Sequence, residues 1–159
     1  MSTRVSKGGI MLSVLLACPL AGMLVIMLMP RSAVHRIRLV ALATTGITCL
    51  VSLQALSGFV PAAGIQWQER VSWIPQLNVF YHLGVDGISL PMVLLTTVLS
   101  FLACLASWSI TERHKEYFVL YLLLEAGMLG TFLALDLFLF YIFWEVVLVP
   151  MYFLIGIWG

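Results

Sequence analysis

The sequence has little charge of either sign. Only 9% of its 159 residues are Asp, Glu, Lys or Arg, whereas 62% are hydrophobic. A water-soluble domain carries about 25% charged residues, so this chain lacks the charge needed to cover a water-facing surface. Its formal net charge of +1 provides no basic field that would attract a nucleic acid. These deficits exclude a soluble enzyme, a disordered tail and a nucleic-acid binder, and they indicate an integral membrane protein.

Cysteine is scarce, and the motifs of common binding sites are missing. The cysteines at positions 18, 49 and 104 have no metal-ligand spacing, and none lies where a disulfide forms readily. We expect these thiols to serve in packing. The sequence contains no nucleophile triad, phosphate loop, zinc ligand set or dinucleotide fingerprint. We therefore expect this chain to bind no metal and no cofactor.

What the sequence does contain is long runs with almost no charge. Each of five runs reaches the roughly 20 residues that a helix needs to cross a hydrocarbon core about 30 Å thick. We predict an all-α fold, a polytopic transmembrane helix bundle in a single region over residues 1–159. The predicted helices cover about 8–29, 39–60, 85–111, 117–135 and 137–158. The first run follows basic residues as a signal peptide would, but it is too long for one, so we expect an uncleaved helix.

The connections predict how the bundle is oriented. We expect a short basic turn over Arg31–Arg38 and a long loop over Val60–Gly84, whose tryptophans favour the membrane interface. Basic residues on alternate sides are Arg4, Lys7 and Arg70 on one side, and Arg31, Arg36, Arg38, Arg113 and Lys115 on the other. Because Lys and Arg are enriched on the cytoplasmic side, we expect the N-terminus outside and the C-terminus at the cytoplasm.

Two carboxylates lie inside the predicted helices. Counted from the turn at Asp136, Glu125 and Glu145 lie ~16 and ~13 Å into the bilayer at ~1.5 Å per residue, so both are near its midplane. A carboxylate there is costly and needs a partner, water or a proton. Because the predicted helices over 117–135 and 137–158 form a hairpin, we expect both carboxyl groups to share one polar layer. Tyr141 and Tyr152 share a face with Glu145, which predicts an inward-facing stripe.

These carboxylates are candidates for proton transfer, Glu145 before Glu125. A buried carboxyl balanced between desolvation and a nearby cation changes protonation when that cation moves. The alternative is that Glu145 stays protonated and hydrogen-bonds a neighbouring helix. Asp86 and His82 lie at a predicted helix start, where Asp86 has either a capping role or a part in ion access, and His82 is either an interfacial imidazole or a part of the same access.

Two motifs carry a family resemblance. The first is LGVDGISL over Leu83–Leu90, and the second is LDLFLFYIFWE over Leu135–Glu145, which continues as VVLVPMYFLIGIWG to Gly159. Together they resemble the proton-translocating M subunits (mitochondrial subunit 4) of NADH–quinone oxidoreductase, respiratory complex I. The resemblance is loose before Gln66 and close from Leu83 onward.

The resemblance implies more than the residues alone. It implies an antiporter-like bundle, of which this chain matches the N-terminal portion. It also implies a bacterial inner-membrane location with a periplasmic N-terminus, and other complex I membrane subunits as partners in the lipid bilayer. Flavin and iron–sulfur clusters are then expected in other subunits. The family's essential glutamate matches Glu145, and its lysine partner lies on a later helix. Because the sequence ends at Gly159, we expect a part of a longer protein.

The resemblance implies a subunit of a proton-translocating enzyme, with no redox chemistry in this chain. It leaves two alternatives open. One is a subunit of a cation/proton antiporter or a membrane-bound hydrogenase, which co-purifying partners would reveal. The other is a structural membrane subunit without proton transfer, in which case neutralising Glu125 and Glu145 leaves pumping intact.

Overall fold

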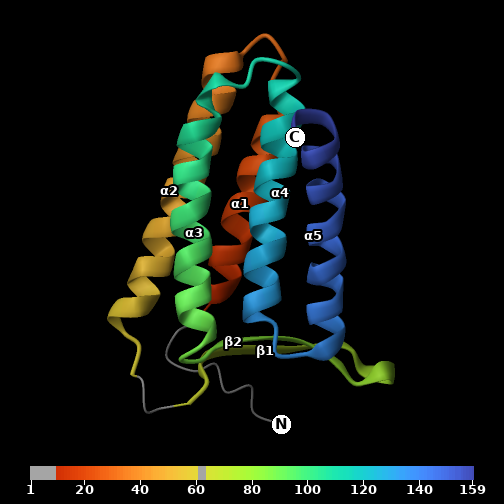
Figure 1. Cartoon of the computed structure of the whole chain (residues 1–159). Coiled ribbons are helices and arrows are strands. Elements are labelled where there is room, and N and C mark those ends of the chain that lie inside the picture. The colour runs from red at the N-terminus through yellow and green to blue at the C-terminus, as the bar shows by residue number, and fades with distance from the viewer. Residues whose placement is uncertain (1–9, 61–63) are drawn as a thin grey trace.

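The computed structural model describes residues 10–60 and 64–159 and contains five long helices that run side by side (Figure 1). Each of the five is long and apolar enough to cross a membrane, which confirms the predicted class of fold and the five spans. The helices are α1 (Met11–Leu28), α2 (Val34–Ser57), α3 (Ser89–Ala106), α4 (His114–Leu133) and α5 (Leu137–Trp158). Arg4 and Lys7, which were assigned to one side of the membrane, lie outside the described residues. The first residues of the predicted 8–29 helix also lie outside them.

Several helix ends differ from the prediction. Helix α2 begins at Val34 rather than near 39, so Arg36 and Arg38 belong to its first turns and not to a basic turn. Charged side chains do not end a helix where their heads reach water at the membrane surface. For the same reason α4 begins at His114 rather than 117. The third helix begins at Ser89 instead of 85 because Val85 is the last residue of a strand.

Residues 66–84 of the predicted loop over Val60–Gly84 belong to a β-hairpin, which corrects that expectation. Strand β1 (Gln66–Ile74) pairs antiparallel with β2 (Val79–Val85), and the hairpin lies across one end of the bundle (Figure 1). Both strands are rich in aromatic and β-branched residues, which favour a pleated surface. A short 3-10 turn over Pro75–Leu77 joins them, and Asn78 accepts the left-handed conformation at φ 54°, as Asn does in turns.

The hairpin is tied to the bundle by buried polar contacts. Glu69 on β1 lies with its carboxylate at the start of α1, where it accepts hydrogen bonds from the backbone N–H of Leu12 at 2.7 Å and of Ser13 at 3.1 Å. The backbone N–H of Leu135 donates to the carbonyl of His82 on β2 at 2.8 Å. These contacts hold the hairpin against α1 and against the turn between α4 and α5.

Helix α4 lies at the centre of the bundle and contacts all four other helices. Its close approach to α5 depends on two glycines, because a Cβ at Gly130 would lie 2.2 Å from Phe143 and one at Gly127 would lie 2.9 Å from Val147. Leu139 and Pro150 are the buried residues of α5. The rest of α5 is therefore largely uncovered by the described residues.

Candidate functional site

The carboxylate of Glu125 is enclosed in the centre of the bundle. Its exposed fraction is 0%, and it lies on α4 between two buried apolar clusters, one containing Leu122 and the other Leu129. Neither carboxylate oxygen has a hydrogen-bond partner among the described residues. A buried polar group without a partner is costly, and such a group in a native protein calls for a proton, a water molecule or a functional role.

Polar side chains of α2, α3 and α4 also lie inside the bundle. Two ionisable side chains lie near Glu125, namely Cys104 on α3 and Tyr121 on α4. The hydroxyl of Tyr121 donates to the carbonyl of Ser100 at 2.5 Å. Further buried hydroxyl residues lie on α2 and α3, and the hydroxyl groups of Ser52 and Thr97 are hydrogen-bonded to each other at 2.8 Å. The buried set is Thr44, Thr45, Thr48, Ser52, Thr96 and Thr97. The interior of the bundle thus contains hydroxyl side chains as well as apolar ones.

Glu145 lies on the opposite side of the helix pair from Glu125. Its side chain is exposed on α5, and Tyr141 and Tyr152 on the same face are 59% and 74% exposed. The expectation of an inward-facing stripe and of one shared polar layer is therefore wrong for the described bundle. Phe143 and Val147 face α4, and a residue two positions from each of them lies on the other side of an α-helix.

Asp86 and His82 lie at the hairpin end of the bundle. The Oδ1 atom of Asp86 accepts hydrogen bonds from the backbone N–H of Ser89 at 2.7 Å and of Ile88 at 3.0 Å. These bonds lower the pKa of Asp86, because they favour the carboxylate. Burial lowers the pKa of His82, and the charge of Arg70 adds to this. The ring Nε2 of His82 is 3.4 Å from Oε1 of Gln68.

Within residues 10–60 and 64–159, no group of three or more His, Cys, Asp or Glu side chains is placed to hold a metal ion. Cys18, Cys49 and Cys104 lie in α1, α2 and α3, and all three are free thiols. The expectation that this chain binds no cofactor stays a prediction.

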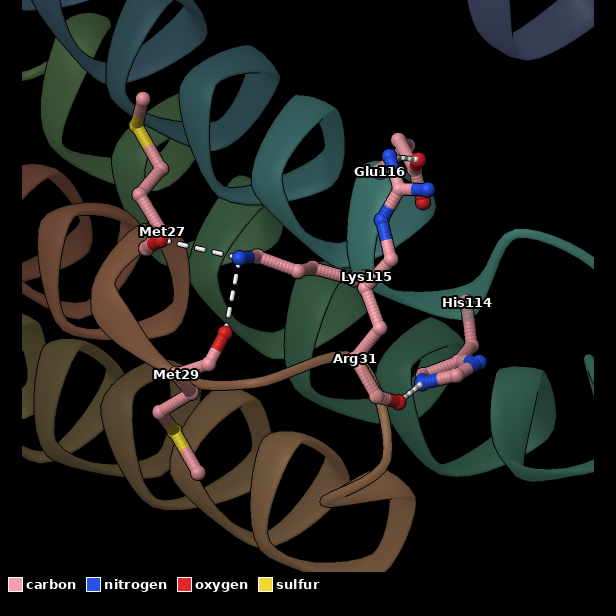
Figure 2. Close-up of polar contacts among 6 residues, drawn as sticks. All are labelled: Met27, Met29, Arg31, His114, Lys115 and Glu116. Atoms are coloured by element: carbon pink, nitrogen blue, oxygen red, sulfur yellow. Dashed lines mark hydrogen bonds and ion pairs between the residues drawn. The ribbon is translucent and has the colours of Figure 1, made fainter.

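Sequence reasoning missed Glu69 and Lys115. Glu69 is buried at 9% exposure and holds the start of α1, although its position in a polar segment suggested only a loop residue. The side chain of Lys115 reaches the end of α1, where its Nζ donates to the carbonyl of Met29 at 2.7 Å and of Met27 at 2.9 Å (Figure 2). No local pattern signals either contact, because the partners lie more than fifty residues away along the chain.

The helices and the enclosed carboxylate together define a polytopic helical membrane protein with ionisable residues inside its spans. Residues 11–136 match the family described as NADH-ubiquinone oxidoreductase chain 4, amino terminus, and the chain belongs to this family. It is 46% identical over 154 residues to NADH-quinone oxidoreductase subunit M of Rhodobacter capsulatus, covering 94% of this chain. It is 48% identical over 130 residues to the subunit M of Escherichia coli K12, covering 77% of this chain.

The chain spans 30% of the length of the Rhodobacter relative and 26% of that of the Escherichia relative. Its fold is similar to a chain of respiratory complex I from Thermus thermophilus with bound NADH, with a TM-score of 0.76 and 25% identity, covering 93% of this chain and 29% of that chain. It also resembles a chain of an archaeal membrane-bound sulfane sulfur reductase, with a TM-score of 0.74 and 22% identity, covering 94% of this chain and 23% of that chain. The second likeness shows the fold alone.

Proposed function

We propose that this chain is part of a membrane subunit of NADH–quinone oxidoreductase that takes part in proton translocation coupled to quinone reduction. Membership of the chain 4 family is the observation that carries this proposal. The redox chemistry then takes place in other subunits, which hold the flavin and iron–sulfur clusters. This chain supplies helices, ionisable side chains and contacts to other membrane subunits.

Glu145 is the proposed proton-handling residue. It matches the motif glutamate of the family, and its carboxyl lies on the face of α5 that α4 does not cover. A cation on another helix of the assembled complex can approach this face directly. A cation nearby favours the carboxylate, and its withdrawal favours the protonated acid. Movement of that cation would therefore drive uptake and release of a proton at Glu145.

Glu125 is the second proposed proton-handling residue. Its support is geometric: the side chain is fully buried, lacks a hydrogen-bond partner among the described residues and lies near Cys104 and Tyr121. An ionised carboxylate is disfavoured in such a place, so the resting form is the protonated acid. Loss of that proton then requires water or a counter-charge to enter the bundle.

The experiment is neutralisation of each carboxyl in the assembled complex. We expect Glu145→Gln to lower NADH-driven proton translocation by about 100-fold. This value is the lower end of the range of effects found when a proton-transferring group is lost. Glu125→Gln should cause a smaller loss. Proton uptake into inverted membrane vesicles measures both, and the amount of complex in the membrane reports assembly. Glu112→Gln is the matched control, because this exposed residue lies outside the helices.

The outcomes separate this proposal from its alternatives. Unchanged translocation in Glu145→Gln would remove its proton-transfer role, and unchanged translocation in the double variant would leave a structural subunit. The likeness in fold to the sulfane sulfur reductase chain shows that this bundle also occurs in another respiratory membrane complex. Co-purification with antiporter or hydrogenase subunits instead of complex I subunits would favour the alternative function, a subunit of a cation/proton antiporter or a membrane-bound hydrogenase.

A further inference from the structure

A groove opens between α1, α4 and α5 at the end of the bundle away from the hairpin. Its volume is about 510 Å³. The walls are apolar side chains of α4 and α5, namely Val119, Leu120, Phe153 and Ile157. Such walls suit a hydrocarbon chain, since they lie along two helices that are apolar enough to span a membrane.

The end of the groove carries positive charge. Arg31, Arg113 and Lys115 line it, and Glu116 is the carboxylate among the lining residues. Arg31 pairs with Glu116 at 2.6 Å, and His114 meets the backbone carbonyl of Arg31 at 3.0 Å (Figure 2). Within the part of the chain that the structure describes, Arg113 makes no ion pair. The groove end therefore keeps a surplus of cations after its internal pairing.

Trp158 lines the charged end of this groove. Its indole N–H donates to the backbone carbonyl of Glu112 at 2.9 Å, and its ring packs edge-on against Tyr117 at 5.3 Å. Trp and Tyr concentrate where hydrocarbon meets headgroups. The cations thus lie at headgroup depth, and the apolar walls lie deeper.

We propose that this groove binds a phospholipid with a net negative headgroup. The phosphate meets Arg113 and Arg31, and one acyl chain lies against the walls formed by α4 and α5. Basic pockets between transmembrane helices suit acidic headgroups. Arg presents a planar fork of donors that matches phosphate oxygens. Charge complementarity favours this occupant over another apolar helix, which would leave the cations without a counter-charge.

The test uses bromine-labelled lipids, which quench a tryptophan they touch. The full chain is placed in phosphatidylcholine vesicles that contain a small fraction of either phosphatidylglycerol or phosphatidylcholine brominated on its acyl chains. Comparison with Trp158→Phe isolates the fluorescence of Trp158 from that of the other tryptophans. We expect brominated phosphatidylglycerol to quench Trp158 at lower concentrations than brominated phosphatidylcholine.

The arginines should set this preference. Because each basic residue near the surface contributes about a fivefold gain in binding acidic lipid, Arg113→Gln should lower the preference about fivefold, and Arg31→Gln should lower it further. Arg113→Gln breaks no ion pair of the described residues, so it also serves if the Arg31 variant misfolds. Arg70→Gln is the control, since its guanidinium lies over the ring of Phe80 in the distant hairpin.

Three results would overturn the proposal. Equal quenching by the two brominated lipids would show that the groove does not select charge. If Arg70→Gln lowered the preference for the acidic lipid as much as Arg113→Gln does, the effect would come from net charge alone. Displacement of the lipid by inorganic phosphate at the same concentration would show that the phosphate group supplies all of the affinity and that the acyl chain contributes none.

Discussion

Single carboxylates hold the ends of helices in this protein. Glu69 reaches from β1 to the first turn of α1, and Asp136 precedes α5 and accepts hydrogen bonds from Phe138 at 2.9 Å and Leu139 at 3.3 Å. The first N–H groups of a helix have no partner within it, and the helix dipole favours negative charge there. Both residues therefore stabilise the hairpin end of the bundle.

Replacing Glu69 should destabilise the fold. Glu69→Gln keeps one acceptor oxygen but removes the charge from the start of α1, so we expect a loss of about 1–3 kcal/mol in the free energy of unfolding. Unfolding in mixed micelles, followed by circular dichroism, measures this loss. Glu112→Gln makes the same chemical change at an exposed site and should stay within about 0.5 kcal/mol of the parent.

Asp136 should make stability depend on pH in the acid range. The backbone N–H of Phe80, followed by those of Leu139 and Phe138, lowers the pKa of Asp136 in the folded protein. A lowered pKa means that the stabilisation is present above the usual Asp pKa and is lost as the pH falls through the lowered folded value. Asn at this position still caps a helix, so Asp136→Asn should fold.

Thermal unfolding of the parent and of Asp136→Asn between pH 3 and pH 6 measures this dependence. We expect the parent to lose more stability than the variant as the pH falls. The same fall in both proteins would show that Asp136 does not carry the dependence. Glu112→Gln should behave like the parent.

At the scale of helices, the contact between α4 and α5 decides which residues of α5 face the bundle. Glycine at 127 and 130 lets Val147 and Phe143 approach the backbone of α4. Small residues on a helix face allow close helix packing in membranes. This packing turns Glu145 to the uncovered face.

Adding a methyl group at Gly130 should disturb this contact. A Cβ there would lie 2.2 Å from Phe143, so the ring or the whole of α5 must move. We expect Gly130→Ala to cost about 1–3 kcal/mol, measured by unfolding in mixed micelles. Gly156→Ala is the matched control, because nothing lies within 4 Å of a Cβ at that position of α5. It should be neutral or stabilising by about 0.5–1 kcal/mol, and equal losses in both variants would contradict the role of Gly130.

At the scale of the molecule, the two ends of the bundle differ in charge. The hairpin end carries Arg70 among the described residues, and the opposite end carries Arg31, Arg36, Arg38, Arg113 and Lys115. The positive-inside rule therefore favours a cytoplasmic location for the end away from the hairpin. A cytoplasmic location would also bring the groove near the anionic leaflet.

Cysteine labelling tests this orientation. Gln76 lies at the exposed tip of the hairpin, and Glu112 is exposed at the other end. In sealed, right-side-out vesicles, we expect a membrane-impermeant maleimide to label Gln76→Cys directly and Glu112→Cys only after permeabilisation. The parent chain is the background control, since its cysteines lie within helices. The reverse labelling pattern would contradict the orientation.

Much of the fold follows from local sequence. The five spans were predictable because a helix in lipid must be long and continuously apolar, and this property is read from a single segment. The family was predictable from Leu135–Glu145, which lies in a contiguous motif. The two intramembrane carboxyl groups were visible for the same reason, since Glu125 and Glu145 are the ionisable acidic side chains that interrupt apolar runs.

The facing of each helix came from the folded bundle. A membrane helix is apolar toward lipid and toward protein, so its pattern does not reveal which side is buried. That is why Glu125 proved enclosed while Glu145 lies on the uncovered face. The hairpin and the bond from Glu69 to Leu12 also depend on partners far apart in the chain. Local composition identifies the membrane-spanning segments of this protein, and long-range packing determines which side chains contact each other.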